Sequence, residues 1–574
     1  MKRQREYPKV VKIAILQINP RLANPEFNGS EIEQRYQEAV AGGAEIVVTP
    51  EMHVAGYIPN DRLWDPGVRY RIQAESERLV RLTGSTPLLL GTVTPAPSGR
   101  LWNELWWCSE GQVHHRIRKR VLPSYDVFDE HRWFEPDPNP QPLISFGGEQ
   151  IGLSICEDLW ANPWGQGSIR YTLNPIEDLV NQGASMLINA SVSPANLGAW
   201  APSKPYLGWV PSKADQRRKI LLDQAQHYKI PIVFASRVGA DSSLIYDGSS
   251  GMASAKGLWQ GAPSFWEGLV WVDTKKPGDP WVVTEDMNWL RKALVTGIRD
   301  NFHKQGLEGA ILGMSGGLDS AVVATLAKEA LGSSRVLAVA LPSMITSSES
   351  LRLAEEQCKK LGMELRTISI ADPHASLEKA ITTQTGTPLA ARTHENLQSR
   401  IRGQILMALT TEPSVHKLLG TDKVTVINTA NKSEAAVGYC TLYGDTVGIL
   451  SPLGDCLKSR VFQLAQSMHG EVLDEIIARP PSAELSPNQT DEEALMPYRE
   501  LDLILSMHLE SSIPFHLIEE KLNNSNLGFP QMSEKINRTQ TLLRHSEFKR
   551  KQMPFSLKVS PKAFGSGRQI PLTS

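Results

Sequence analysis

The feature that most constrains this chain is a glycine-rich turn between two apolar stretches. Residues 309–312 are small and apolar, residues 313–320 read Gly-Met-Ser-Gly-Gly-Leu-Asp-Ser, and residues 321–328 favour a helix. This pattern predicts a buried strand, a tight turn and a helix. The turn would place serine hydroxyls and unpaired N–H groups at a helix N-terminus, which favours a bound phosphate. Glycine lets the backbone approach such a ligand closely, and Asp319 could hold a Mg²⁺ ion that bridges the phosphates.

The turn differs from the phosphate loop of kinases and GTPases, because no lysine follows its glycines. An ordinary glycine turn is the other interpretation, but the whole loop pattern stands between a predicted strand and helix. The run Ser-Gly-Gly-x-Asp-Ser at residues 315–320 resembles the pyrophosphate loop of the ATP pyrophosphatases, which cleave ATP to AMP and pyrophosphate while they adenylate an acceptor. This resemblance implies that ATP contacts Gly313, Met314, Ser315, Gly316, Gly317, Leu318, Asp319 and Ser320.

Length and composition limit the class of protein. A chain of 574 residues is too long for one core, and its net charge of −2 gives no reason to expect a nucleic-acid or membrane partner. The five cysteines are scattered without a C-x-x-C pair, so neither a disulfide framework nor a zinc knuckle is indicated. No apolar run approaches the roughly 18 residues of a membrane span. We therefore expect a cytoplasmic protein.

The N-terminal half alternates strand-like and helix-like segments, which indicates an α/β layered fold. A polar helix is expected over residues 30–41. The predicted strands cover residues 11–17, 45–51, 87–94, 101–109, 150–156, 186–190, 232–236 and 268–272.

Three stretches of this half carry reactive side chains: Glu51, Lys119 and Cys156. A thiol attacks an amide as the thiolate, and a nearby carboxylate can take its proton. A lysine can then stabilise the oxyanion of the tetrahedral intermediate. Taken singly, the cysteine could be a core residue and the charged residues could be solvated. The combination is more specific than its members.

In these contexts the three residues resemble the Glu-Lys-Cys triad of the nitrilase superfamily, and Glu130 matches the second glutamate of that family. The runs Gly56–Asp61 and Leu122–Glu130 are most similar to the glutaminase domain that is fused to NAD synthetase. The resemblance implies an αββα sandwich that hydrolyses a carboxamide through a thioester. It also implies that Tyr125 contacts glutamine.

Two segments depart from that branch of the family. Residues 239–250 lack its Gly-Gly-Gln-Asp-Glu-like run, and residues 193–196 differ from its usual Ser-Pro-Phe. These loops lie near the amide pocket in the family. An alternative therefore stays open, in which the synthetase uses free ammonia and the first domain acts on another amide or is structural. The Pro- and aromatic-rich loop 195–212 suggests no function of its own.

The C-terminal half predicts a parallel, doubly wound sheet with ligands at the carboxyl ends of its strands. We expect a helix over residues 289–303, strands over 336–340, 363–370 and 424–429, and helices over 350–361 and from 395. Glu434 follows the last strand and would be a second carboxylate for Mg²⁺, opposite Asp319.

Long motifs in this half resemble NAD synthetase. They lie at residues 431–445, 480–489 and 558–568, while residues 411–423 look like an insertion that touches no motif. The resemblance implies Mg²⁺ ligands at Asp319 and Glu434. It implies further ATP contacts at Thr429, Lys458 and Ser482. It implies deamido-NAD contacts at Asn396, Arg400, Glu434 and Lys549.

Together these features predict a two-domain α/β enzyme that resembles the glutamine-dependent NAD synthetases. Residues 1–275 would be the nitrilase-like glutaminase, 276–284 a linker, and 285–574 an adenine-nucleotide hydrolase-like synthetase domain. The expected reaction amidates deamido-NAD to NAD with ATP and glutamine and needs Mg²⁺. The resemblance also implies a homo-oligomer. A non-catalytic nucleotide-binding scaffold is disfavoured, because both reactive motifs are intact.

Overall fold

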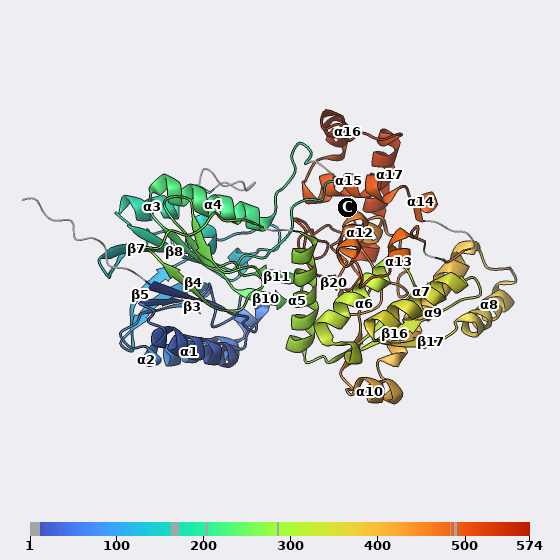
Figure 1. Ribbon diagram of the computed structural model, residues 1–574, viewed down its shortest axis with the longest axis horizontal. Coiled ribbons are helices and arrows are strands. Elements are labelled where there is room, and N and C mark those ends of the chain that lie inside the picture. Colours follow the sequence, from blue (N-terminus) through green and yellow to red (C-terminus); the bar gives the residue numbers. More distant parts are fainter. Residues whose placement is uncertain are drawn as a thin grey trace, which may run out of the picture. The chain divides into compact units, whose positions relative to one another are not determined.

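The computed structural model describes residues 12–161, 171–202, 205–283, 286–482, 484–486 and 491–573 (Figure 1). The chain forms two compact units. Unit 1 comprises residues 1–195, 213–241 and 245–284, and unit 2 comprises residues 196–212, 242–244 and 285–574. None of the described helices combines the length and the apolar character that a bilayer crossing requires.

Unit 1 is built on two six-stranded sheets. The strands of the first sheet, in spatial order, are β14 (Gly268–Asp273), β1 (Lys12–Gln17), β2 (Ile46–Val48), β3 (Leu88–Pro95), β4 (Leu101–Ser109) and β5 (Gln112–Arg118). Those of the second are β13 (Trp259–Gly261), β12 (Gly251–Ala253), β9 (Ile232–Ala235), β8 (Met186–Ala190), β7 (Glu149–Ile155) and β6 (Ile144–Phe146). A hairpin of β10 (Val238–Asp241) and β11 (Leu244–Asp247) stands apart from both.

The two sheets pack face to face and carry helices on their outer faces (Figure 1). Side chains from both sheets form one apolar core, for example Val48 and Leu89 with Leu153 and Ile188. The outer helices are α1 (Pro25–Ala41), α2 (Pro66–Leu82), α3 (Pro175–Asn181) and α4 (Lys213–Tyr228). This arrangement is the expected αββα sandwich.

The strands predicted for this half are all present, and the helix predicted over residues 30–41 is the greater part of α1. Proline and a capping side chain start α1 five residues earlier, since Asn24 accepts a hydrogen bond from the Phe27 N–H. β5 was not predicted, because its exposed positions carry His and Arg in place of the usual strand formers. Its pairing with β4 sets the strand.

Unit 2 contains a parallel four-stranded sheet in the order β17-β16-β15-β18. These strands are β15 (Gly309–Gly313), β16 (Val336–Ala340), β17 (Glu364–Thr367) and β18 (Val424–Val426). The helices that alternate with them are α5 (Met287–Gln305), α6 (Leu318–Leu331), α7 (Ser348–Leu361), α8 (Ala371–Thr385), α9 (Ala391–Leu409) and α10 (Pro413–Leu419). The predicted doubly wound parallel sheet is confirmed, and the insertion 411–423 folds as α10.

The remainder of unit 2 is mainly helical. Its elements are α11 (Lys432–Val437), β19 (Leu450–Ser451), α12 (Lys458–Ser467), α13 (Asp474–Ala478), α14 (Asp491–Ala494), α15 (Tyr498–Leu505), a π-helical turn at Ser506–Glu510, α16 (Phe515–Asn524), α17 (Met532–His545), α18 (Glu547–Arg550) and β20 (Phe555–Ser556).

The loop that the sequence left without a function belongs to unit 2. The chain leaves unit 1 after Ala195 and returns to it at Lys213. Within this excursion Trp200 and Tyr206 are buried in the apolar core that α15 and α16 also form. The Trp200 backbone N–H donates to the Glu510 carboxylate at 2.8 Å. A segment from the middle of the first half of the sequence therefore completes the core of the second unit.

Candidate active sites

In unit 1, the cysteine lies where a central strand ends. β7 stops at Ile155, and Cys156 opens a 3₁₀ turn with φ +43°. A non-glycine residue in this left-handed region stores on the order of 1–3 kcal/mol of strain, which persists only where neighbours over-determine the backbone. Asp158 provides part of that support by accepting the Ile155 N–H at 3.0 Å. The sharp turn directs the Cys156 thiol away from the strand, toward the carbonyl of Val192 at 3.9 Å.

The Lys119 ammonium lies between two buried carboxylates. Its Nζ donates to Glu51 Oε1 and to Glu130 Oε1, each at 2.7 Å, and all three side chains are fully buried. Glu51 also accepts from the Asn103 amide at 2.7 Å and from the backbone N–H of Val192 at 3.1 Å. The structure thus brings together the glutamates and the lysine that the sequence singled out.

The electrostatics of this cluster disfavour the thiolate form of Cys156. Burial raises the pKa of Cys156 well above its usual range, and Glu51 raises it further, against the effect of Lys119. Burial alone would lower the pKa of Lys119, but Glu130 and Glu51 outweigh it and raise the value well above the ordinary one. Burial also raises the pKa of Glu130 to about 7, although Lys119 opposes this. Attack by Cys156 therefore requires a base within the cluster.

Several supporting residues escaped the sequence analysis. Asp158 accepts the backbone N–H groups of Arg120 and Val121 at 3.1 and 2.9 Å, which ties the cysteine turn to the segment after Lys119. The pKa of this carboxyl is raised to about 6 by burial. Tyr57 donates to Glu130 at 2.6 Å. Asp158 stands two residues after Cys156, and Tyr57 lies in the run Gly56–Asp61 that carries the family resemblance, but neither position signalled these contacts.

Glu157, the residue after Cys156, holds the side chain of Tyr125 in position. Its hydroxyl donates to the two oxygens of Glu157 at 3.1 and 3.0 Å, and the hydroxyl of Tyr171 donates to the same carboxylate at 3.0 Å. Burial raises the pKa of Tyr125 well above its usual range, and Glu157 adds to this. The tyrosine is therefore a neutral donor next to the thiol turn.

The segments that depart from the family pattern form a joined structure. Residues 238–247 are the β10–β11 hairpin, and the Ala195 N–H donates to Ile245 O at 2.7 Å, which links the two departures. The buried Arg237 forms an ion pair with Asp241 at 2.6 Å. These changes build internal contacts around the hairpin.

In unit 2, the carboxyl ends of the parallel strands open on a cavity of about 320 Å³. The turn between β15 and α6 lines it, together with Thr429, Glu434, Lys458 and Ser482. Apart from Gly316, the residues predicted to contact ATP, which come from four separate parts of the sequence, therefore line one cavity, as expected for ligands at the end of such a sheet.

The turn has the form expected of a phosphate site. Gly316 has φ +77°, and a Cβ added there would lie 2.2 Å from Ser350 O, so only glycine fits. Ser315 and Ser320 face each other with their hydroxyl oxygens 3.1 Å apart, and the Gly317 N–H donates to Ser315 Oγ at 3.2 Å. α6 starts directly after Gly317 and presents its N-terminus to the cavity.

The two predicted metal carboxylates share one ammonium group. Lys458 Nζ forms a short ion pair with Asp319 and lies 3.9 Å from Glu434 Oε1. Burial raises the pKa of Glu434 to about 8, the Asp319 carboxylate raises it further, and Lys458 opposes both. The two carboxylates thus share one lysine, and burial disfavours the charged form of Glu434.

The residues predicted to contact deamido-NAD surround one segment next to the cavity, residues 438–445. Asn396 Oδ1 accepts from the Thr441 hydroxyl at 3.0 Å, and Arg400 Nε donates to Leu442 O at 3.2 Å. Lys549 Nζ donates to Gly438 O at 2.7 Å and to Cys440 O at 2.6 Å. Of these four residues, only Glu434 lines the cavity itself.

One polar cluster of the cavity wall was missed. Arg479 donates to Ser350 Oγ at 2.7 Å and to Glu484 Oε1 at 2.8 Å. Arg402, two residues after Arg400 on α9, is half-buried and donates to Leu341 O at 3.0 Å. The guanidinium groups of Arg479 and Arg402 line the cavity as additional cations.

Comparison with known proteins agrees with this geometry. The carbon-nitrogen hydrolase family matches residues 12–276, and the NAD synthase family matches residues 290–553. A glutamine-dependent NAD(+) synthetase from Synechocystis sp. is 36% identical over 583 residues, which span 98% of both chains. A protein of that name from Xylella fastidiosa is 35% identical over 547 residues, 93% of this chain and 92% of its own.

Solved structures share the fold. A glutamine-dependent NAD+ synthetase from Acinetobacter baumannii in complex with ADP has a TM-score of 0.73 and 28% identity, and the alignment covers 98% of this chain and 99% of that one. One from Cytophaga hutchinsonii has a TM-score of 0.79 at 19% identity, with 99% and 98% covered. With both families matched in order and the full-length relatives covered almost completely, the chain belongs to the glutamine-dependent NAD(+) synthetases.

Proposed function

We propose that this chain amidates deamido-NAD to NAD, with glutamine as the nitrogen donor and ATP as the energy source. Glutamine and water give glutamate and ammonia, and ATP leaves as AMP and pyrophosphate. The observation that carries the proposal is the presence in one chain of a buried thiol–lysine–glutamate cluster and of a glycine-turn cavity with two carboxylates. The thiol–lysine–glutamate cluster alone would not explain the nucleotide cavity, and the cavity alone would not explain the cluster.

In the first half-reaction, Glu51 takes the thiol proton and Cys156 attacks the carboxamide carbon of glutamine. The Lys119 ammonium, held by Glu51 and Glu130 at 2.7 Å, stabilises the oxyanion. Collapse releases ammonia, which takes its proton from Glu51, and leaves a thioester on Cys156. Water deprotonated by Glu51 then hydrolyses the thioester to glutamate. Tyr125 contributes to the glutamine pocket.

In the second half-reaction, the nicotinate carboxylate of deamido-NAD attacks the α-phosphorus of ATP and pyrophosphate leaves. The turn 313–320 holds the phosphates through its N–H groups and the N-terminus of α6. Thr429, Lys458 and Ser482 complete the ATP contacts. Asn396, Arg400, Glu434 and Lys549 bind deamido-NAD. Ammonia then attacks the acyl-adenylate, and AMP leaves.

The chemistry of the donor set fits a magnesium ion. Asp319 and Glu434 offer oxygen ligands of the kind that Mg²⁺ prefers, and Lys458 alone leaves their charge incompletely neutralised. When bound, the ion would neutralise charge on the triphosphate and on the leaving pyrophosphate. The raised pKa of Glu434, to about 8, is consistent with a carboxylate placed for a cation.

We also propose how the chain is divided into domains. Residues 1–275 form the glutaminase, 276–284 the linker and 285–574 the synthetase, with 196–212 contributed to the core of the latter. The five cysteines are unpaired, which supports a reducing, cytoplasmic location. The homo-oligomer rests on the family resemblance, and light scattering of the purified protein tests it.

The first test is NAD formation from deamido-NAD and ATP, with glutamine or ammonium as donor, in the wild type and in Cys156→Ala. We expect the variant to lose the glutamine reaction and keep the ammonium reaction. Ammonium activity without glutamine activity in the wild type would instead favour a first domain that acts on another amide. Loss of both reactions in a folded Cys156→Ala would contradict the assignment of Cys156 to the glutaminase alone.

A further inference from the structure

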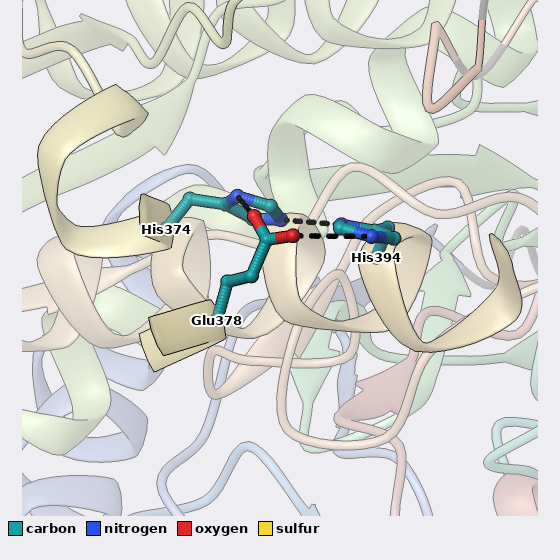
Figure 2. Close-up of side chains that lie close together, drawn as sticks. All are labelled: His374, Glu378 and His394. Atoms are coloured by element: carbon teal, nitrogen blue, oxygen red, sulfur yellow. Dashed lines mark hydrogen bonds and ion pairs between the residues drawn. The ribbon is translucent and has the colours of Figure 1, made fainter. Parts of the chain in front are cut away.

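A side-chain cluster of unit 2 lies outside both active sites. His374 and Glu378 belong to α8, and His394 belongs to the first turn of α9 (Figure 2). One nitrogen of each histidine and one oxygen of the glutamate lie within 4.8 Å of one another. The cluster does not line the ATP cavity, and the proposed reaction uses none of its members.

The spacing of these residues brings their side chains to one place. His374 and Glu378 are four residues apart, so they occupy the same face of α8, one turn from each other. That face meets α9, where the His394 ring stacks on the His374 ring with centroids 5.3 Å apart. The two rings and the carboxylate therefore converge from two helices.

The separations suit ligands of one metal ion. His374 Nε2 and His394 Nδ1 are 3.5 Å apart, and His394 Nε2 lies 3.6 Å from Glu378 Oε1. The distance from His374 Nδ1 to Glu378 Oε2 is 3.9 Å. Metal–ligand bonds of about 2.0–2.2 Å place two tetrahedral ligands roughly 3.4 Å apart. The three distances involve both nitrogens of each ring; one atom of each side chain lies within 4.8 Å of the other two, and rotation of the rings would have to shorten this spacing for an ion to bind.

The exposure of α8 suggests what a metal ion at this cluster would do for the fold. α8 has 15 residues, none of them is fully buried, and its apolar Ile381 is only half-buried. In proteins most of the stability of a helix comes from packing of an apolar face. Because the cluster lies on the side of α8 that meets α9, an ion there would supply a link that packing does not provide.

We propose that His374, Glu378 and His394 form a site for a transition-metal dication of the zinc class, which fastens α8 to α9. Two imidazole nitrogens and one carboxylate suit Zn²⁺, Co²⁺, Ni²⁺ or Cu²⁺, whereas Mg²⁺ and Ca²⁺ prefer oxygen ligands. The site is therefore separate in chemistry from the proposed Mg²⁺ ligands Asp319 and Glu434. Three protein ligands leave a coordination position for water.

The test uses the chelator-treated full chain and Co²⁺, whose visible absorption reports tetrahedral nitrogen and oxygen coordination. The variants are His374→Ala, His394→Gln and the isosteric Glu378→Gln. The matched control is His469→Ala, because His469 also pairs with a carboxylate, Asp474 at 3.1 Å, but belongs to no three-ligand cluster among the residues that the structure describes. Melting in chelator checks that the variants fold as the wild type does.

We expect one Co²⁺ per chain at this site, displaced by Zn²⁺ and unaffected by excess Mg²⁺. Loss of a ligand should weaken binding by about 100-fold or more, since even supporting residues around metal ligands contribute about 10–100-fold. Zn²⁺ should slow amide hydrogen exchange in α8 in the wild type and in His469→Ala, and should leave it unchanged in the three ligand variants. No Co²⁺ band, or equal binding in all the variants, would overturn the proposal. None of these outcomes depends on the synthetase or glutaminase activity.

Discussion

At the scale of single residues, both sites depend on buried charges that are incompletely balanced. Lys119 serves two glutamates in unit 1, and Lys458 serves Asp319 and Glu434 in unit 2. Under the proposed function, the thiol proton of Cys156 passes to Glu51, which is already in place, whereas the carboxylates of unit 2 would be neutralised by a bound cation.

The role of Glu51 can be separated from its role in packing. Glu51→Gln keeps the shape and removes the base, so we expect the glutamine-dependent rate to fall by about 10²–10⁴. The ammonium-dependent rate should stay near that of the wild type, because the synthetase residues are untouched. Parallel assays with the two nitrogen donors measure this. An equal fall in both rates would show that Glu51 acts on the fold.

The raised pKa of Glu434 makes stability depend on pH in a defined direction. Its pKa is about 8 in the folded chain and 4.5 ordinarily, so between these values the folded chain holds a proton that the unfolded chain releases. The free energy of unfolding therefore falls as pH rises through this window. We expect Tm to fall less steeply from about pH 5 to 8 in Glu434→Gln than in the wild type.

Calorimetry across that range, without and with Mg²⁺ and ATP, checks this prediction. The exposed Glu534 provides the matched control, and Glu534→Gln should follow the wild-type profile. Mg²⁺ should flatten the wild-type profile and leave that of Glu434→Gln nearly unchanged. The same slope in Glu434→Gln and in the wild type would contradict the assignment.

At the scale of elements, the strand–turn–helix unit of unit 2 requires a glycine at position 316 for two reasons, its backbone conformation and its close packing. Gly316 has φ +77° and lies against the Ser350 carbonyl, whereas Gly332 has φ +87° with open space around it. Gly332→Ala should cost only the strain of a backbone with φ +87° and ψ 146°, about 1–3 kcal/mol.

Gly316→Ala adds a steric clash to the same strain, since the new Cβ would lie 2.2 Å from Ser350 O. We expect it to lower stability more than Gly332→Ala does and to reduce ATP affinity at least tenfold, because the turn must shift. Denaturant unfolding and ATP titration of both variants measure the difference. Equal ATP affinity in the two variants would place the phosphates elsewhere.

At the scale of the whole molecule, the chain does not divide at one point. Residues 196–212 leave unit 1 and complete the core of unit 2, where Trp200 is 4% exposed and Tyr206 2%. The Tyr206 hydroxyl lies 3.0 and 2.8 Å from those of Ser506 and Ser511. Unit 2 therefore includes residues 196–212, which end 73 residues before its main segment, residues 285–574, begins.

Trp200→Ala should destabilise unit 2 by about 3–5 kcal/mol, the usual effect of removing a large buried aromatic side chain. Leu207→Ala is the matched control in the same segment, because Leu207 is 62% exposed. Unfolding in urea, monitored through the loss of ATP binding, reports on unit 2. We expect Trp200→Ala alone to lose ATP binding at lower urea. Equal midpoints for the two variants would show that the excursion contributes little.

Local patterns in the chain predicted the α/β layers, which the structure confirms, and singled out the glycine turn and Glu51, Lys119 and Cys156 as candidate site residues. A strand, a turn and a helix are encoded by neighbouring residues, and a reactive side chain at a strand end is visible from its own context. For the same reason the isolated motifs could be matched to known families, and the order of the two halves followed from the chain itself.

Other features depended on contacts between residues distant in the chain, for which no periodicity or spacing exists. Lys458 and Asp319 are 139 positions apart, and packing of α12 and α6 brings them together. The entry of Trp200 into the core of unit 2 and the meeting of His394 with His374 have the same origin. Distances of this kind follow from how apolar surfaces are buried across the whole fold, so they emerge only in three dimensions.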